Sequence, residues 1–303
     1  MENVIVIGGG PAGLSAAIYL ARAGLSPLVF AGSPPGGQLM LTSEVENYPG
    51  FESVLGAELI KKMRGQAEKF GAKILDQNIS KVDLSRSPFK LMASSPVLTK
   101  SVIVATGAKA LWLGLPSEKR LLGKGVSACA TCDGFFFRDK TVAVVGGGDT
   151  ALEEALTLTK FAKKVYVIHR RDSFRASKII QERVFNNPKI EIIWNAVVEE
   201  IVGENRVDGI KLKVKSEKLK VEIQNLKLEG VFVAIGHKPN TDIFKGQVKM
   251  DEKGYILTSQ SATSVKGVYA AGDCVDYQYR QAAVAAGMGV SAALDVEEWL
   301  ESA

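Results

Sequence analysis

The sequence predicts an α/β protein made of two Rossmann-like dinucleotide-binding domains of the three-layer ββα type, with the second inserted in the first. Two glycine-rich turns predict the two domains, because each follows a short apolar run and precedes a helical segment. A late apolar run that ends at Gly272-Asp273 returns the chain to the first domain. We therefore expect residues 1–111 and 241–303 to form the first domain and residues 112–240 to form the second.

The first glycine turn follows a continuous apolar run, Val4–Ile7, which is typical of a buried parallel strand. A helix over 14–23 and a strand over 28–30 come next. The turn matches G-x-G-x-x-G at Gly8, Gly10 and Gly13. This order of elements is the context that a dinucleotide-binding turn requires, and a purely structural glycine turn is the alternative.

The rest of the first domain is predicted to combine one helix with short strands. The acidic residue that usually ends the second strand of such a turn is missing, because Ala31-Gly32 stands there, so another group must hold the ribose. Helical periodicity covers 58–70. We expect short meander strands, and then a buried strand that ends in a glycine turn, at 73–75, 79–84, 89–92, 97–99 and 101–107.

The second glycine turn repeats the pattern of the first. A strand is predicted at 141–145, a helix at 152–161 and a strand at 165–168. The turn itself reads G-x-G-x-x-A from Gly146 to Ala151. Two independent matches in the right context argue against a chance origin.

A cluster of basic side chains follows the second turn's second strand. The cluster consists of His169, Arg170, Arg171 and Arg175. An acid at this position would bind a ribose 2′-hydroxyl, whereas arginines favour a 2′-phosphate, so we expect NADPH and not NADH. The alternative is a basic surface turn.

The chain after this cluster is predicted to form more strands and one last helix. Strands are expected at 190–194, 197–201, 207–214, 221–226, 231–236 and 267–272. His237 is interpreted as a structural or surface residue rather than a base. The last helix, 282–294, is rich in Ala and Gly, which allows close approach to a ring system or to a neighbouring helix.

Two cysteines, Cys129 and Cys132, lie between the two glycine turns with two residues separating them. A C-x-x-C pair can close a small disulfide and is reactive when its thiolate is stabilised. Zinc binding is the alternative, but it needs two further ligands, and the candidates are Cys274, His169 and His237. We expect no metal site, and we interpret Cys274 as a buried filler.

Composition excludes several other classes of function. The chain has 303 residues, 46% hydrophobic residues and a formal charge of +5 that is spread along its length, so we expect no nucleic-acid face. No apolar run reaches the about 18 residues that a membrane helix needs. The first residues, Met1-Glu2-Asn3, lack the basic start and cleavage site of a signal peptide. Three cysteines are too few for a secreted disulfide framework.

Taken together, the chain resembles the low-molecular-weight, bacterial-type thioredoxin reductases over essentially its whole length. The matching stretches are Gly8–Gly13, Gly36–Leu39, Glu46–Gly50, Cys129–Gly134, Gly146–Ala151, His169–Arg171, Phe174-Arg175, Gly236, Gly272-Asp273 and Arg280–Ala282. The resemblance implies NADPH-dependent reduction of the disulfide of thioredoxin, with FAD held non-covalently on the first domain and NADPH on the second. It also implies a cytoplasmic homodimer.

The resemblance further assigns roles to individual residues. Cys129 and Cys132 would form the redox disulfide, with Cys132 next to the flavin, Cys129 attacking the partner and Asp133 managing the thiol protons. The flavin contacts would be Gly8, Gly10, Pro11, Ala12, Gly13, Ala31, Gly32, Gly36, Gly37, Gln38, Leu39, Asn47, Thr106, Gly107, Gly272, Asp273, Arg280, Gln281 and Ala282. The NADPH contacts would be Gly146, Gly148, Asp149, Thr150, Ala151, His169, Arg170, Arg171, Arg175 and Gly236.

Two alternatives to thioredoxin reduction keep the same architecture. One is a reductase of another thioredoxin-like or glutaredoxin-like carrier, and the other is a flavoprotein that transfers electrons without a dithiol step. Both the nicotinamide and the cysteines belong to the second domain, so we also expect that domain to rotate between two half-reactions. We expect its hinges at Pro116 and at the Gly236–Pro239 turn.

Overall fold

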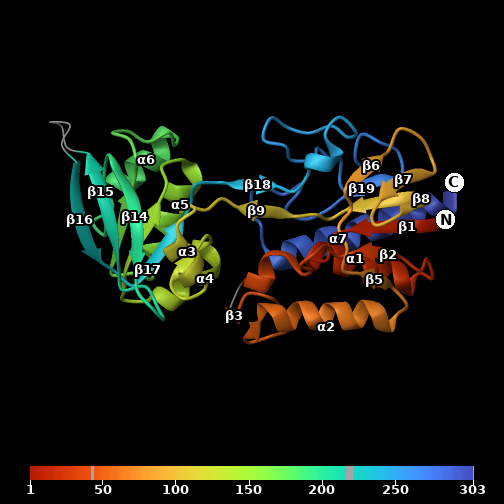
Figure 1. Cartoon of the computed structure of the whole chain (residues 1–303), viewed down its shortest axis with the longest axis horizontal. Coiled ribbons are helices and arrows are strands. Elements are labelled where there is room, and N and C mark those ends of the chain that lie inside the picture. Colours follow the sequence, from red (N-terminus) through yellow and green to blue (C-terminus); the bar gives the residue numbers. More distant parts are fainter. Residues whose placement is uncertain (42–43, 216–220, 303) are drawn as a thin grey trace. The chain divides into compact units, whose positions relative to one another are not determined.

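The computed structural model describes residues 1–41, 44–215 and 221–302, and the chain in it forms two units joined by two crossings (Figure 1). Unit 1 contains Met1–Lys109 and the residues from Lys238 onward, and unit 2 contains Ala110–His237. The expected domain limits were 111 and 240. The two crossings lie in the paired strands β9 (Ala108–Ala110) and β18 (His237–Pro239).

The main sheet of unit 1 is parallel in its centre and antiparallel at one edge. Its order is β5 (Lys73–Leu75), β2 (Leu28–Phe30), β1 (Glu2–Ile7), β8 (Pro96–Val104), β7 (Phe89–Met92) and β6 (Lys81–Asp83). The strands from β5 to β8 are parallel, whereas β7 and β6 form an antiparallel meander with the first half of β8. The second half of β8 also pairs in parallel with β19 (Val268–Ala270).

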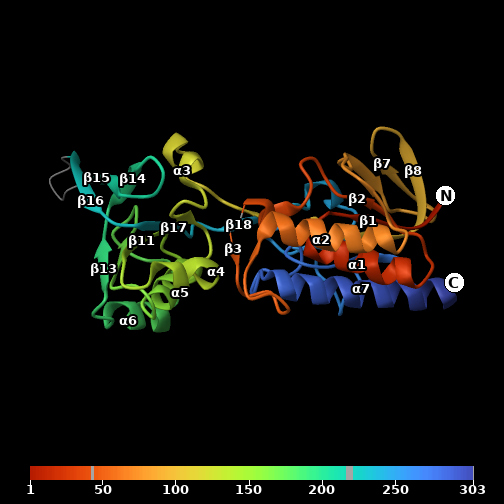
Figure 2. The same ribbon diagram turned by 90° about the horizontal axis from the view of Figure 1, so that it is seen from below.

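Alternate residues of β1 face two different layers. Val4 and Val6 pack against the helices, whereas Ile5 and Ile7 belong to a second core that they share with the buried side chains of β6 and β7. The helices α1 (Pro11–Arg22), α2 (Gly56–Lys69) and α7 (Ala282–Ser302) lie together on one side of the sheet (Figure 2). A Cβ at Gly289 would lie 2.0 Å from the carbonyl oxygen of Ala12, so the small residues of α7 permit its close contact with α1.

Unit 2 repeats this three-layer plan. Its sheet is fully parallel, in the order β10 (Val126–Ser127), β17 (Gly230–Val233), β11 (Thr141–Val145), β12 (Lys164–Ile168) and β13 (Ile190–Ile193). Val142 and Val144 face a core shared with α5 (Asp149–Leu158) and α6 (Lys178–Phe185). Ala143 and Val145 face the antiparallel strands β14 (Ala196–Val202), β15 (Gly209–Lys215) and β16 (Val221–Lys227). The predicted fold class is confirmed.

Short elements complete the two units. Unit 1 contains the 3₁₀ helices η1 (Gly37–Leu41) and η3 (Asp242–Phe244) and the paired strands β3 (Glu44–Val45) and β4 (Val54–Leu55). Unit 2 contains α3 (Pro116–Leu121), α4 (Ala130–Asp133) and the 3₁₀ helix η2 (Gly134–Phe137). Pro116 is thus the first residue of a helix inside unit 2, and the hinge expected there does not lie at a crossing.

Several predicted elements differ from those observed. Residues 97–99 and 101–104 belong to one strand, β8, because no turn residue separates them. The strands predicted at 73–75 and 190–194 are not part of a meander but pair in parallel with β2 and β12, since a short apolar run does not reveal its partner. Helix α7 continues to Ser302 because Val296, Trp299 and Leu300 still pack on the core.

Candidate functional site

The first glycine turn joins β1 to α1, and its fingerprint glycines meet different constraints. Gly8 has a φ of 129°, and a Cβ there would lie 2.0 Å from the carbonyl oxygen of Ala105. A Cβ at Gly13 would lie 1.9 Å from the carbonyl oxygen of Gly8. By contrast, the Cβ position at Gly10, the N-cap of α1, has nothing within 4 Å. The fold therefore requires Gly8 and Gly13, whereas the open space at Gly10 suits the approach of a phosphate to the helix N-terminus.

Most residues assigned to the flavin follow the carboxyl ends of parallel strands. Because these strands run in one direction, their carboxyl ends meet at one edge of the sheet, where ligands of such folds bind. Ala31 and Gly32 follow β2, Thr106 and Gly107 follow β8, and Gly272 and Asp273 follow β19. The residues present therefore fit a dinucleotide on this edge of unit 1.

Two more assigned residues are brought together from distant parts of the chain. The side-chain amide of Asn47 donates a hydrogen bond to Oε1 of Gln281 at 3.2 Å, which joins the loop after β3 to the start of α7. Gly36 and Gly37 have φ values of 100° and 67° and lead into η1, which carries Gln38 and Leu39. These contacts place the predicted loop residues within unit 1 as well.

The carboxyl group of Asp273 is electrostatically unusual. Its pKa is raised to about 6, first by burial and then by the nearby Asp276, and Arg280 opposes the change. Asp276 is already engaged, since its oxygens accept hydrogen bonds from the backbone N–H groups of Gln278, Tyr279 and Arg280. A ligand hydroxyl that donated to Asp273 would stabilise its ionised form, which fits the flavin contact predicted for this residue.

The second glycine turn, between β11 and α5, has the same division of roles. A Cβ at Gly146 would lie 2.5 Å from both the Cβ of Ala151 and the carbonyl oxygen of Ala234, whereas the Cβ position at Gly148 has nothing within 4 Å. Gly148 is the N-cap of α5, so open space again lies at a helix N-terminus. Asp149 and Thr150 follow it in the first turn of α5.

His169 packs beneath this turn. A Cβ at Gly147 would lie 2.2 Å from Nδ1 of His169, so only glycine permits the ring to lie there. The ring also contacts Phe174 and Trp194, with centroids at 5.5 and 6.0 Å. His169 is only 7% exposed, and burial lowers its pKa. The structure thus gives His169 a packing contact with the turn.

The three predicted arginines lie on the loop that follows β12, and all three are exposed. The backbone N–H of Arg175 donates to the carbonyl oxygen of Gly147 at 2.8 Å, and the carboxylate of Asp149 accepts from the backbone N–H of Ser177 at 2.8 Å. These two bonds fold the loop back onto the glycine turn. Exposed guanidinium groups beside a phosphate-binding turn can bind a second phosphate group.

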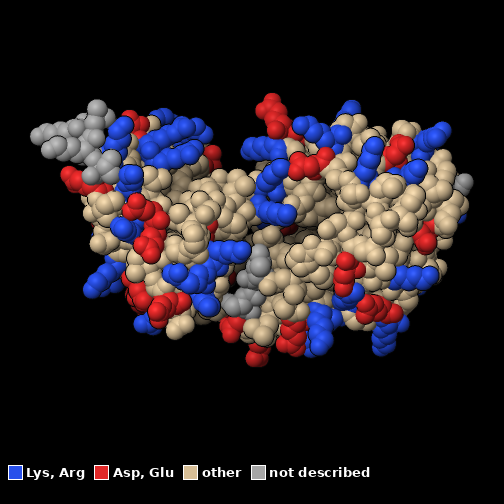
Figure 3. Space-filling model, in the orientation of Figure 1, with Lys and Arg blue, Asp and Glu red and all other residues tan. Residues whose placement is uncertain are grey.

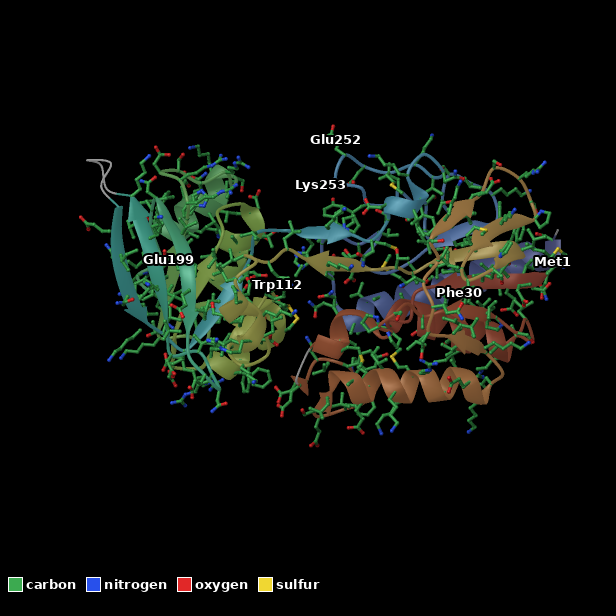
Figure 4. The ribbon with its side chains drawn as sticks, viewed as in Figure 1. Met1, Phe30, Trp112, Glu199, Glu252 and Lys253 are labelled. Carbon is green, nitrogen blue, oxygen red and sulfur yellow. A yellow bond between two sulfur atoms is a disulfide. The ribbon has the colours of Figure 1, made fainter. Side chains whose placement is uncertain are left out.

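Cys129 and Cys132 form a disulfide, with their Cα atoms 5.3 Å apart (yellow bond in Figure 4). Cys129 is the N-cap of α4, and its Sγ accepts a hydrogen bond from the backbone N–H of Cys132 at 3.1 Å. Both residues are partly exposed. An N–H donor at Sγ would also stabilise a thiolate at Cys129 after reduction.

Asp133, the last residue of α4, lies beside this pair. Burial raises the pKa of its carboxyl group, and a hydrogen bond with the side chain of Ser127 opposes that change. Its backbone N–H donates to the carbonyl oxygen of Cys129 at 3.1 Å. A carboxyl group with a raised pKa next to a dithiol is better suited to proton exchange than an ordinary aspartate. The prediction for Cys129, Cys132 and Asp133 therefore names three residues that the fold brings together in unit 2.

The third cysteine has a structural environment. Cys274 is fully buried, its Sγ lies 3.3 Å from the carbonyl oxygen of Ala271, and burial raises its pKa to about 11. In the part of the chain that the structure describes, no three His, Cys, Asp or Glu side chains are grouped so as to hold a metal ion. None of the described helices combines the length and apolar composition that crossing a bilayer demands. Basic and acidic side chains are interspersed over the face shown in Figure 3.

Comparison with known proteins identifies relatives along the whole chain. A family model described as pyridine nucleotide-disulphide oxidoreductase matches residues 2–289. A thioredoxin reductase of Rickettsia conorii is 53% identical over 306 residues, which cover 98% of each chain. Among solved structures, thioredoxin reductase from Giardia duodenalis has 44% identity and a TM-score of 0.94, and it covers 99% of this chain and 98% of its own. The enzyme from Streptococcus pyogenes has 40% identity and a TM-score of 0.95, with 100% and 99% covered.

These matches confirm the resemblance to thioredoxin reductases that the motifs predicted. They also agree with the site geometry, in which a glycine turn at an open helix N-terminus and a disulfide occur in one unit. The chain belongs to the pyridine nucleotide-disulphide oxidoreductase family.

Proposed function

We propose that this chain is a thioredoxin reductase that uses NADPH to reduce the disulfide of a thioredoxin, with FAD as its bound cofactor. The observation that carries the proposal is the Cys129–Cys132 disulfide in a unit that also holds a glycine turn with an open helix N-terminus and an arginine-rich loop. Relatives named thioredoxin reductase, at about half identity over the whole chain, support thioredoxin as the partner.

Unit 1 would hold the FAD. The open space at the Cβ position of Gly10 would admit the diphosphate. The raised pKa of Asp273 suits a carboxylate that would accept a hydrogen bond from a hydroxyl group of the ligand. Asn47 and Gln281, already hydrogen-bonded to each other, would flank the same ligand. When bound, FAD supplies a group that accepts a hydride from a nicotinamide and gives an electron pair to a disulfide.

Unit 2 would bind NADPH. Gly148 would admit its diphosphate, and Arg170, Arg171 and Arg175 would contact the 2′-phosphate. The buried ring of His169 would pack against Gly147. It would not act as a general acid, because burial lowers its pKa.

The reduced cysteine pair would then reduce the partner. The thiolate of Cys129 attacks one sulfur of the partner disulfide, and the displaced partner sulfur takes up a proton. Cys132 next attacks the sulfur of Cys129, which reforms the Cys129–Cys132 disulfide and releases the second partner thiol. Two electrons and two protons pass from the dithiol to the partner, and Asp133 exchanges the protons.

The two chain crossings are suited to a rigid-body rotation of unit 2 between half-reactions. Both crossings lie in the short pair of β9 and β18, and glycines with left-handed φ values precede both, Gly107 at 65° and Gly236 at 120°. A few residues at such element ends can absorb large changes of φ and ψ. The proposal also includes the homodimer and the cytoplasmic location that the family resemblance implies.

Turnover with defined partners tests the function. The purified protein should consume NADPH only when an oxidised bacterial thioredoxin is added, and a glutaredoxin in a parallel assay tests the alternative carrier. Cys129→Ser and Cys132→Ser should both abolish turnover, whereas the buried control Cys274→Ser should retain it, because burial raises the pKa of that thiol far above neutrality.

A trapping experiment separates the roles of the two cysteines. Cys132→Ser should accumulate a mixed disulfide between Cys129 and the partner, because the resolving thiol is missing. Trapping through Cys132 in the Cys129→Ser variant would reverse the assignment. Retained turnover in Cys132→Ser would instead favour electron transfer without a dithiol step.

A further inference from the structure

Two side chains with no part in the proposed mechanism lie next to the chain crossings, one in each unit. The first is that of Glu118 in α3, which is only 2% exposed. Among the residues that the structure describes, no other acidic residue is as little exposed. Its Oε1 accepts a hydrogen bond from the backbone N–H of Leu113 at 2.8 Å, and its Oε2 accepts one from the backbone N–H of Gly114 at 2.9 Å. Both oxygens therefore bind the segment that follows the first crossing.

Helix α3 connects this carboxylate to the body of unit 2. The Oγ of Ser117 accepts a hydrogen bond from the backbone N–H of Ile201 in β14 at 3.0 Å, and the guanidinium group of Arg120 donates to the carbonyl oxygen of Gly203 at 2.9 Å. The backbone from Leu113 onward is thus hydrogen-bonded into unit 2. It cannot change its φ and ψ angles without breaking bonds to a charged group, which are stronger than neutral hydrogen bonds.

The second side chain is that of Asn240 in unit 1, the first residue after β18. Its side-chain amide donates a hydrogen bond to the carbonyl oxygen of Thr106 at 2.9 Å, and its backbone N–H donates to the carbonyl oxygen of Gly107 at 2.9 Å. The next residue, Thr241, is buried, and its hydroxyl donates to the carbonyl oxygen of Gly254 at 2.6 Å. Asn240 therefore fixes the backbone before the first crossing to the backbone after the second, within unit 1.

Two short segments of the crossings lie between these bonds, residues 108–112 and residues 236–239. The backbone N–H of Leu111 donates to the carbonyl oxygen of Gly236 at 2.9 Å, which joins the two segments to each other inside unit 2. The bonds of Glu118 and Asn240 hold the flanking backbone within one unit each. A rotation of unit 2 must therefore be absorbed by the two short segments.

We propose that Glu118 and Asn240 are positioning residues that confine the hinge of the rotation to residues 108–112 and 236–239. The inference rests on the rotation of unit 2 that the proposed function includes. Hinges of few residues leave unit 2 few orientations, so its nucleotide site and its cysteine pair return to defined positions in each half-reaction. Defined positions are needed because reacting atoms must approach to about 3–3.5 Å.

The width of the distance distribution between two spin labels tests this confinement. Lys61→Cys in α2 and Lys213→Cys in β15 place one exposed label in each unit of the oxidised, flavin-loaded protein. The native cysteines do not compete for the label, because Cys129 and Cys132 form the disulfide and Cys274 is fully buried. Pulsed electron paramagnetic resonance then gives the distribution of distances between the two units.

Loss of either fixing side chain should widen this distribution. Glu118→Ala frees the backbone after the first crossing, and hydrogen exchange of the Leu113 and Gly114 amides should become about tenfold faster or more, because each loses a bond to a charged group. Asn240→Asp has the same shape but replaces the amide donor with an acceptor, which repels the carbonyl oxygen of Thr106. Glu118→Gln keeps one acceptor oxygen and should widen the distribution less, and it replaces Glu118→Ala if that variant does not fold.

Two matched controls remove a similar bond at neither crossing. The carboxylate of Glu229 accepts a hydrogen bond from the backbone N–H of Thr141 at 2.8 Å in unit 2, and Oε1 of Gln247 accepts one from the backbone N–H of Leu84 at 2.9 Å in unit 1. Glu229→Ala and Gln247→Ala should keep the wild-type width. An unwidened distribution in either test variant, or equal widening in the controls, would overturn the proposal.

Turnover links the hinge to the reaction. With saturating NADPH and a bacterial thioredoxin, Glu118→Ala should turn over about tenfold more slowly or worse at full flavin content, because displacement of reacting atoms by about 1 Å costs up to about a hundredfold. Unchanged turnover in a variant with a widened distribution would overturn the role in the reaction. Failure of the wild type to reduce any thioredoxin would refute the proposed function, and the label distances would still decide whether Glu118 and Asn240 confine the hinge.

Discussion

The two open glycines, Gly10 and Gly148, allow ligand binding to be separated from folding in each unit. Both are helix N-caps, and nothing lies within 4 Å of either Cβ position. Gly10 has a φ of −84° and Gly148 a φ of −97°, which alanine adopts without strain. We therefore expect Gly10→Ala and Gly148→Ala to fold normally and to lose binding of one dinucleotide each.

The magnitudes follow from what the added methyl group meets. In the protein without ligand it meets nothing, and exchange of glycine for alanine at an N-cap costs about 1 kcal/mol or less. In the complex it occupies the space that a phosphate needs, and overpacking of that kind typically costs about 1–3 kcal/mol, or one to two decades in affinity. Gly13→Ala is the matched contrast, because its Cβ would lie 1.9 Å from a backbone oxygen and should destabilise unit 1 itself.

Three measurements test the separation. Thermal unfolding gives the stability of each variant, the ratio of released flavin to protein gives FAD content, and the KM for NADPH reports the second site. Gly10→Ala should lower the flavin content alone, and Gly148→Ala should raise the KM for NADPH at full flavin content. The reasoning is refuted if Gly10→Ala keeps all its flavin, or if Gly148→Ala loses flavin instead of NADPH affinity.

Three further predictions follow from the charges and the connection of the units. The double variant Arg170→Ala/Arg175→Ala should raise the KM for NADPH by one to two decades and reduce the preference for NADPH over NADH, because charge-assisted hydrogen bonds of about 1.5–3 kcal/mol are lost. The exposed control Arg183→Ala should change neither the KM nor the preference. An unchanged preference for NADPH over NADH in the double variant would contradict the 2′-phosphate assignment. The pKa of Asp273 in the folded protein is about 6, above the ordinary 3.8, so ionisation of this residue destabilises the flavin-free fold increasingly as pH rises from about 4 to above 6. Asp273→Asn should therefore stabilise the apoprotein by up to about 3 kcal/mol near pH 8 and should not stabilise it below about pH 4. Equal stabilisation at both pH values in thermal unfolding would exclude ionisation of Asp273 as the cause. An engineered crosslink that joins units 1 and 2 should stop turnover and leave one half-reaction intact in rapid-mixing measurements, and full turnover by completely crosslinked protein would rule out rotation.

Residues whose role depends on close neighbours in the chain could be predicted from the sequence. The spacing of Gly8, Gly10 and Gly13 indicated a phosphate turn because strand, turn and helix are consecutive, and the close approach of Gly13 to Gly8 is a contact within one turn. The pairing of Cys129 with Cys132 spans three residues, so their proximity needs no long-range folding. The three-layer plan of both units could likewise be predicted, since short apolar runs and glycine turns recur in the same order.

Helix α6 shows where local patterns fail. Over Lys178–Phe185, only Val184 is buried, so there is little apolar periodicity to detect. The sequence predicts the strands β5 and β13 but not their pairing partners, because a short apolar run does not specify which other segment will pair with it.

Tertiary structure alone decided which groups meet across long separations. Position 8 requires glycine because the carbonyl oxygen of Ala105 lies where a Cβ would be. The side chain of Asn47 is hydrogen-bonded to that of Gln281. The same is true of burial, which is the main cause of the raised pKa of Asp273, about 6, and of the raised pKa of Asp133. The sequence could determine the type of chemistry, because residue identity and local spacing carry it, whereas desolvation and non-local contacts exist only once the chain has folded.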